Sequence, residues 1–312
     1  MNVTIIVFSP TGNTRKVGQM LEESLRGGGT SVQLLDITRR HDLFAEGGFT
    51  EFLREEVEPH DVLCVGGPVY AHHMQHTVLD LVKALDPPRR RREAYAVPFA
   101  TYGTVSSGVA LAETARLLHR SGRLPALAMK IDARHCYSEI LGTEINPGMP
   151  GDEAWPHVRE LARRIAQLPH DRRVTNLARS PDLDYLGWPD RMKARFLIRE
   201  KLFQKLIYPR LEFRPEACSG CGLCVDVCPL GRLCVYDGKV GIRAGQPACI
   251  HCGICVTTCP REAIVFPGDL SKWASLLRQA ASGKGFIASD EAAKSAVYPI
   301  RDRRRTGAIP SA

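Results

Sequence analysis

One cysteine pattern occurs twice in this chain of 312 residues, and it constrains the fold more than any other feature. The first run is Cys218-x2-Cys221-x2-Cys224-x3-Cys228-Pro229, and the second is Cys249-x2-Cys252-x2-Cys255-x3-Cys259-Pro260. Of the 11 cysteines, only Cys64 and Cys136 lie outside the stretch from Cys218 to Cys259. Clustering at such short spacing, in a chain with no recognisable secretory leader, indicates metal ligation rather than a disulfide framework.

Thiolates bind both zinc and iron–sulfur clusters, and the spacing separates the two. Paired Cys-x2-Cys units are enough for tetrahedral zinc, which needs neither the further cysteines at x2 and x3 nor the proline that follows them. The doubled run therefore favours iron–sulfur clusters, with zinc as the alternative. Gly220, Gly222 and Gly253 allow the backbone to wrap closely around such a group. Cys234 lies outside both runs and is interpreted as a small buried hydrophobic residue.

Residues 216–268 resemble the bacterial ferredoxins that carry two [4Fe–4S] clusters in a small α+β domain. In that pattern, the fourth cysteine of each run ligates the cluster of the other run. The resemblance implies that one cluster (cluster 1) is held by Cys218, Cys221, Cys224 and Cys259. It implies that the other (cluster 2) is held by Cys249, Cys252, Cys255 and Cys228.

The first 170 residues alternate β-rich runs with amphipathic helical stretches. Strands are predicted over 3–8, 31–37, 62–65, 94–100 and 124–131, and helices over 13–26, 76–85, 106–120 and 153–168. A strict alternation of this kind predicts a parallel sheet with helices on both faces, which is a doubly wound α/β fold. Ligands of such sheets bind at the carboxyl ends of the strands.

Three predicted loops at these strand ends carry residues suited to a phosphate and an aromatic ring. Ser9-Pro10-Thr11-Gly12-Asn13-Thr14 follows the first strand, Gly66–Tyr70 the third, and Thr101-Tyr102-Gly103 the fourth. The first offers hydroxyls and the N–H groups of a helix N-terminus to a phosphate, although Ser and Thr also serve there as ordinary N-caps. A planar aromatic ligand with a phosphate tail is expected between Tyr70 and Tyr102.

Together these segments resemble the FMN site of flavodoxin-like proteins. The resemblance covers about residues 1–170 and implies a five-stranded parallel sheet in the order 2-1-3-4-5. It implies that the FMN phosphate is held by Ser9, Thr11, Gly12, Asn13 and Thr14, and that the isoalloxazine ring is surrounded by Pro68, Val69, Tyr70, Thr101, Tyr102 and Gly103. The second position after Tyr70, often glycine in related flavoproteins, is His72.

Four parts are expected along the chain: an FMN-binding domain (1–170), a basic helical connector (171–215), the two-cluster ferredoxin domain (216–268) and a basic C-terminal tail (269–312). The tail is expected to contain one helix near 270–281. The formal net charge is +8, and the excess lies in the connector and the tail. Two clusters and an FMN phosphate would offset most of this charge, so it does not indicate nucleic-acid binding. The apolar side chains of 191–206 are expected to pack between the domains, with peripheral membrane contact as the less favoured alternative.

The apolar runs are much shorter than the roughly 20 residues of a transmembrane helix. With no signal peptide evident either, a cytoplasmic location is expected. Both resemblances together imply a flavodoxin–ferredoxin fusion that passes electrons between two [4Fe–4S] clusters and FMN, and exchanges them with redox partner proteins. One alternative is an FMN-dependent reductase of a quinone-like molecule, its pocket lined by His72, His73 and residues 132–150. Another is an iron–sulfur sensor without flavin. No side chain is assigned as an acid, base or nucleophile.

Overall fold

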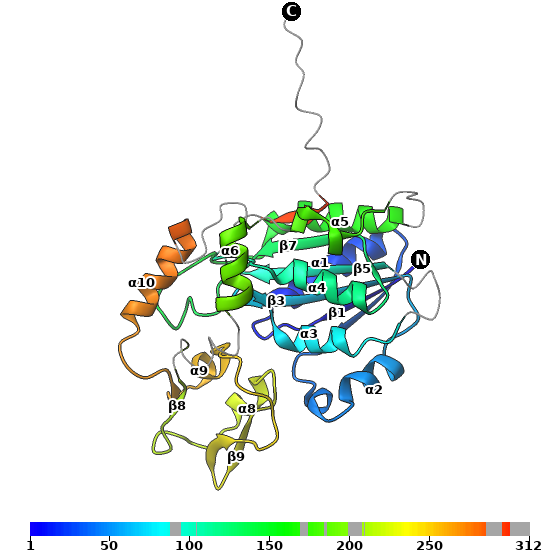
Figure 1. Ribbon diagram of the computed structural model, residues 1–312. Coiled ribbons are helices and arrows are strands. Elements are labelled where there is room, and N and C mark those ends of the chain that lie inside the picture. Colours follow the sequence, from blue (N-terminus) through cyan, green and yellow to red (C-terminus); the bar gives the residue numbers. More distant parts are fainter. Residues whose placement is uncertain are drawn as a thin grey trace, which may run out of the picture.

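The structure is a computed structural model that describes residues 1–87, 95–103, 105–168, 174–183, 186–198, 208, 210–284 and 295–299. An α/β domain and a small cysteine-rich lobe lie side by side in it (Figure 1). The long parallel strands of the α/β domain are β1 (Asn2–Val7), β2 (Ser31–Asp36), β3 (Val62–Tyr70), β5 (Tyr95–Tyr102) and β7 (Ala128–Asp132). They lie in the order β2-β1-β3-β5-β7, which is 2-1-3-4-5 when these strands are counted along the chain.

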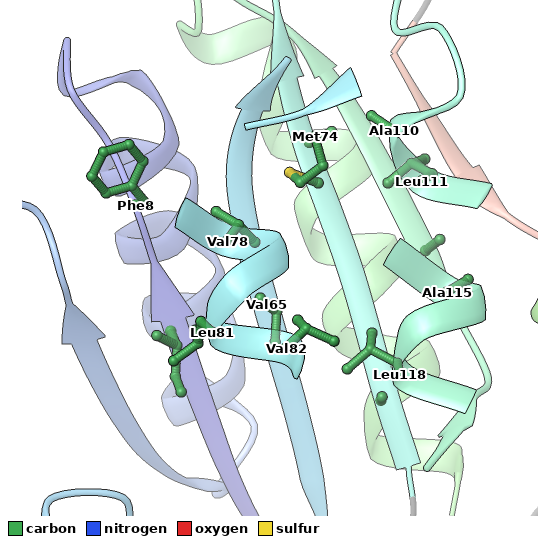
Figure 2. Close-up of a cluster of buried hydrophobic side chains, with 14 of the residues drawn as sticks. Phe8, Val65, Met74, Val78, Leu81, Val82, Ala110, Leu111, Ala115 and Leu118 are labelled. Carbon is green, nitrogen blue, oxygen red and sulfur yellow. The ribbon is translucent and has the colours of Figure 1, made fainter. Parts of the chain in front are cut away.

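Helices cover both faces of this sheet because alternate residues of each strand point to opposite sides. Val3, Ile5 and Val7 of β1 pack with α1 (Asn13–Gly27) and α5 (Trp155–Gln167) on one face. Phe8 and Val65 pack with α3 (His76–Lys83) and α4 (Ala110–Arg120) on the other, as Figure 2 shows. The unpredicted helix α2 (Gly48–Glu55) adds Phe52 to this second core.

Two short strands flank β3 and β5. The segment predicted as a single strand over 124–131 forms two strands, β6 (Leu124–Pro125) and β7, both paired with β5. After β3 the chain turns back into β4 (His73–Met74), which pairs antiparallel with β3.

Gly66–Tyr70, expected to be a loop, instead continues β3. A Cβ on Gly66 would lie 2.1 Å from Cζ of Phe99, and a Cβ on Gly67 would lie 2.6 Å from Cγ2 of Val78. Close packing against the neighbouring strand and helix, rather than a turn, therefore requires glycine at these positions. The extended strand carries Pro68, Val69 and Tyr70 to the carboxyl edge of the sheet.

The cysteine-rich lobe is built from two similar halves. Each contains one short helix, α8 (Leu223–Val227) or α9 (Ile254–Thr258), preceded by a left-handed glycine: Gly222 at φ 81° and Gly253 at φ 78°. The two helices pack against each other. Two antiparallel pairs complete the lobe: β9 (Leu233–Tyr236) with β10 (Lys239–Ile242), and β8 (Glu212–Phe213) with β11 (Ile264–Val265).

The side of the lobe that carries the end of the first cysteine run and the start of the second docks on the α/β domain. The Arg39 N–H donates to the Pro229 carbonyl at 3.1 Å. Leu230, Ile250 and Cys252 join the hydrophobic core on the α3/α4 face of the sheet. The β9 end of the lobe lies farther from the sheet (Figure 1). The docked side of the lobe is therefore internal, and the side that carries β9 faces outward.

After the lobe the chain returns to the α/β domain. The helix expected near 270–281 forms as α10 (Ser271–Gln279), whose Arg278 donates to Oγ1 of Thr143 at 3.0 Å. Strand β12 (Ala296–Tyr298) then pairs antiparallel with β7 at the sheet edge. Nothing in the residue pattern predicted this strand. Segments of the α/β domain therefore both precede and follow the lobe in the sequence.

The described part of the connector includes α6 (Trp188–Met192), which continues into a π-helical turn over Lys193–Leu197. Ala194 and Ile198 are buried, whereas Phe196, which was predicted to lie on the buried stripe, is exposed. Residues 199–206 of the predicted 191–206 segment lie outside the described residues. Among the residues described, no helix is both long and apolar enough to cross a membrane.

Candidate functional site

The cysteines of the two runs line two separate cavities. Cys218, Cys221, Cys224 and Cys259 line the outer one. Cys228, Cys249, Cys252 and Cys255 line the inner one, which has a volume of about 270 Å³. Because α8 and α9 pack against each other, the last cysteine of each run faces the first three of the other. Among the described residues, no group of three or more His, Cys, Asp or Glu is placed to hold a metal ion.

Backbone N–H groups donate to a sulfur in each cavity. The bonds join Arg232 N to Cys228 Sγ (3.3 Å), Ala263 N to Cys259 Sγ (3.2 Å), Val240 N to Cys218 Sγ (3.4 Å) and His251 N to Cys249 Sγ (3.3 Å). Two of the donors lie four residues after the final cysteine of a run. The two halves of the repeat therefore share this hydrogen bond as well as the cysteine spacing. Bonds of this kind stabilise thiolates and help to set cluster potentials.

The two cavities differ in their access to solvent. Cys221 in the outer cavity is exposed, whereas Cys252 and Cys255 in the inner cavity are buried. Burial raises the pKa of Cys255 to about 12 and raises the pKa of Cys252 as well. Buried thiols of this kind ionise only when cations compensate the charge, and the irons of a cluster would supply them.

A third cavity, of about 440 Å³, lies at the carboxyl ends of β3 and β5; we call it the flavin pocket after the ligand predicted for it. Its lining includes Thr11, Asn13, Pro68, Val69, Tyr70, Thr101, Tyr102 and Gly103 from the set predicted to bind FMN. Its volume lies within the usual range for small-molecule and cofactor sites. The structure therefore brings together, around one cavity, residues from all three of the predicted segments.

Three other residues predicted to bind FMN do not line the pocket but shape the loop beside it. The hydroxyl of Ser9 accepts from the Arg15 N–H at 2.9 Å, and the hydroxyls of Thr14 and Thr101 lie 2.8 Å apart. Gly12 takes a φ of 86° where α1 begins. The first N–H groups of a helix have no intrahelical partner, so this end of α1 is suited to an anion.

The remaining walls come from segments that the residue pattern predicted only in part. Residues 133–137, which follow β7, fall within the 132–150 range expected for a reductase pocket. His72 lines the pocket as that alternative expected, whereas His73 points to Glu113 instead. Tyr208 and α10, which contributes Trp273 and Leu277, close the far side, and no sequence signal placed them there.

Two polar atoms at the pocket have no hydrogen-bond partner among the described residues: Nδ1 of His72 and the hydroxyl of Tyr137. Buried polar groups are nearly always paired in folded proteins, so these two are suited to the polar edge of a ligand. Burial lowers the pKa of His72 to about 4, and the pKa of His135 falls to about 4 for the same reason. Both imidazoles are therefore neutral at pH 7.

His72 also has an uncommon backbone conformation. Its φ is 65°, in the left-handed region that glycine adopts readily, and its carbonyl accepts from the Val109 N–H at 2.8 Å. A Cβ on Gly108 would lie 2.0 Å from that carbonyl oxygen. A histidine thus occupies a left-handed position that glycine adopts readily.

Tyr70 and Cys136 form a neutral pair in the pocket wall. The Tyr70 hydroxyl donates to the Cys136 sulfur, while burial raises the pKa of Cys136 to about 11 and that of Tyr70 as well. Tyr70 belongs to the same buried core as Cys252 of the inner cavity. The wall of the flavin pocket therefore reaches a predicted ligand of cluster 2.

A single layer of side chains separates the flavin pocket from the inner cysteine cavity. Tyr137 lines the pocket, and a Cβ on Gly253, which lines the inner cavity, would lie 3.6 Å from its Cε1. The ring of Tyr208 lies with its centroid 6.1 Å from that of Tyr137 and 5.4 Å from that of His251. His251 stands between Cys249 and Cys252. An almost continuous path of rings thus joins the two cavities.

Comparison with known proteins bears most directly on the cysteine-rich lobe. Residues 217–264 match the family model of the 4Fe-4S dicluster domain. No curated protein matches the chain. A flavodoxin from the domain Archaea is 16% identical, covering 55% of this chain and 100% of its own, with a TM-score of 0.36. Flavodoxin 1 from Bacillus cereus is 15% identical, covering 54% of this chain and 98% of its own, with a TM-score of 0.37.

The rubredoxin oxygen:oxidoreductase of Desulfovibrio gigas is 18% identical over 54% of this chain, with a TM-score of 0.39, and the match covers only 35% of that protein. The strand order and the position of the flavin pocket, rather than these distant likenesses, define the first domain. The chain therefore joins a flavodoxin-like α/β domain to a 4Fe-4S dicluster domain.

Proposed function

We propose that this protein is a cytoplasmic electron-transfer protein that passes electrons between two [4Fe–4S] clusters and a bound FMN. The clusters supply one-electron steps, and FMN supplies either one- or two-electron steps. The chain's own part is to hold these groups close together, to shield them from water and to present one of them to a redox partner.

The residues around the flavin pocket fit FMN. The N-terminus of α1, bordered by Thr11 and Asn13, is suited to the phosphate. Tyr70 and Tyr102 are buried aromatic walls for the ring. The unpartnered Nδ1 of His72 and hydroxyl of Tyr137 are suited to the polar edge of the ring.

The observation that carries the proposal is the thin wall between the flavin pocket and the inner cysteine cavity. Tyr137 borders the pocket on one side and approaches Gly253 on the other, so cluster 2 would lie next to the flavin. The outer cavity, with the exposed Cys221, lies on the far side of the lobe. This arrangement supports an electron path from a partner through cluster 1 and cluster 2 to FMN, or the reverse.

The proposal is tested by purifying the full chain under anaerobic conditions and assaying iron, zinc and released flavin, followed by a dithionite titration monitored by visible absorbance. The proposal expects two four-iron clusters and one FMN per chain, all reducible. Clusters without flavin, even after incubation with FMN, would instead support an iron–sulfur sensor. Zinc in place of iron after cluster reconstitution would show that the cysteines have another role.

A reductase of a quinone-like molecule is the second candidate, favoured by the position of His72 and residues 133–137 on the pocket wall. The loaded protein distinguishes the two functions. A reductase turns over a soluble quinone analogue at a rate that saturates with quinone concentration. An electron carrier shows no saturable site for the quinone and is oxidised instead by a partner protein.

A further inference from the structure

Large apolar side chains protrude from the connector next to the α/β domain. Trp188 is 67% exposed, Phe196 51% and Leu197 59%. They lie on α6 and on the π-helical turn that follows it, at the side of the molecule where α10 also lies (Figure 1). Three large apolar side chains exposed within ten residues of chain are a candidate interaction surface.

The segment that carries them is firmly attached to the α/β domain. Ala194 and Ile198 are buried with Val109 and Leu186 in a small core. Nε2 of His73 donates to the carbonyls of Ala194 and Ile198 at 2.9 and 2.7 Å.

On the other side of its ring, Nδ1 of His73 lies 2.9 Å from a carboxylate oxygen of Glu113 in α4. Burial alone would lower the pKa of His73, but Glu113 and the two carbonyls outweigh burial and raise it. The connector is therefore clamped to α4, and the exposure of the three apolar side chains is a fixed feature of the fold.

The same segment is basic. It carries Arg191, Lys193 and Arg195 but only one acidic residue, Asp190, which pairs with Lys193 at 2.8 Å. Arg195 is exposed, and its guanidinium carbon lies 5.7 Å from the ring centroid of Phe196. Cations beside exposed Trp, Phe and Leu are typical of segments that lie in the headgroup region of a bilayer.

We propose that this surface, formed by Trp188, Phe196 and Leu197 with Arg191 and Arg195, binds a membrane surface that contains anionic lipids. A stable protein interface buries roughly 800 Å² on each partner, more than three side chains provide. Insertion into the headgroup region requires only protruding apolar side chains with cations beside them. The contact is peripheral, and it does not depend on the cofactors or on the proposed electron path.

The test is co-sedimentation of the full, cofactor-loaded chain with vesicles of phosphatidylcholine alone and of phosphatidylcholine mixed with phosphatidylglycerol. Binding to the mixed vesicles is expected to be at least about tenfold stronger and to weaken as salt is added. Trp188→Ser should weaken that binding by about tenfold, because an aromatic side chain supplies much of the inserted area. Arg191→Gln together with Arg195→Gln should remove the preference for anionic lipid.

Tyr236→Ser is the matched control, because Tyr236 is also an exposed aromatic residue but lies on the outer hairpin of the lobe. It should leave vesicle binding unchanged. Trp188→Phe, which retains an aromatic side chain, should restore most of the binding lost in Trp188→Ser. The proposal is overturned if the native chain binds neither kind of vesicle, or if Tyr236→Ser weakens binding as much as Trp188→Ser. Capture of a protein by this surface without vesicle binding would also overturn it.

Discussion

Tyr137 and Gly253 meet where the two domains touch: a Cβ on Gly253 would lie 3.6 Å from Cε1 of Tyr137. Tyr137 belongs to the wall of the flavin pocket, and Gly253 precedes α9 in the cavity of the predicted cluster 2 ligands. Glycine at this position allows the two domains to approach closely. The proposed electron path depends on this contact.

Gly253→Ala is expected to disturb that contact, because its Cβ would lie 2.3 Å from Cδ1 of Ile140. Gly222→Ala is the matched control: Gly222 has nearly the same φ and the same place before α8, but nothing lies within 4 Å of its Cβ position. Both variants incur the strain of a left-handed alanine, about 1 kcal/mol. Only Gly253→Ala should lose roughly 1 kcal/mol more of unfolding free energy. Only in this variant should electron exchange with the flavin become slower. Equal effects in denaturant unfolding and in flavin-reduction kinetics would argue against the contact.

The crossed ligand sets predict different losses from the two final cysteines. Cys228→Ser should remove cluster 2, beside the flavin, whereas Cys259→Ser should remove cluster 1 at the outer surface. Iron content should fall by about half in both variants. Reduced Cys259→Ser protein should still pass electrons to the flavin, and reduced Cys228→Ser protein should do so far more slowly. The reverse result would show that the sets are not crossed.

Tyr137→Phe removes one of the unpartnered polar atoms of the pocket while leaving the ring in place. If that hydroxyl bonds to FMN, the dissociation constant should rise by roughly three- to tenfold, the usual effect of one neutral hydrogen bond. Fluorescence titration of the flavin-free protein with FMN measures this change. An unaltered affinity would mean that the Tyr137 hydroxyl does not contact the flavin.

Acid should weaken the flavin domain, because the pKa values of His72 and His135 lie near 4, below the ordinary 6.5. The folded state favours the neutral rings, so their contribution is complete above pH 6.5 and is lost as pH falls from 6.5 through about 4. Each ring contributes up to about 3 kcal/mol, less where solvent enters the pocket.

His135→Asn should therefore flatten the decline in unfolding free energy between those pH values. His157→Asn, on α5 and away from the pocket, is the control and should keep the native slope. Equal slopes in all three proteins would contradict the assignment.

The residue pattern was enough to predict the parallel sheet and most of the pocket residues at the carboxyl ends of its strands. Short buried strands such as 62–65 alternate with amphipathic helices, and that periodicity follows from burial on both faces of the sheet. It was misleading where glycine serves packing: Gly66 and Gly67 suggested a loop, yet they lie within β3 because Phe99 and Val78 leave no room for a side chain.

Features created by tertiary contact could not be predicted. Strand β12 has only three residues, and it forms because the edge of β7 is available for pairing. Tyr208 and Trp273 reach the flavin pocket only because the lobe docks there. The expected buried stripe of the connector failed at Phe196, because the π-helical turn buries Ala194 and Ile198 instead.

The most direct test of the central claim is a rapid-mixing experiment on the loaded, anaerobic protein. A limiting amount of reductant is added, and the bleaching of the clusters and of the flavin is followed over a range of protein concentrations. Transfer within one chain predicts that the flavin is reduced as the clusters are reoxidised, at a rate independent of protein concentration. A rate proportional to protein concentration, or a flavin that stays oxidised beside reduced clusters, would contradict it.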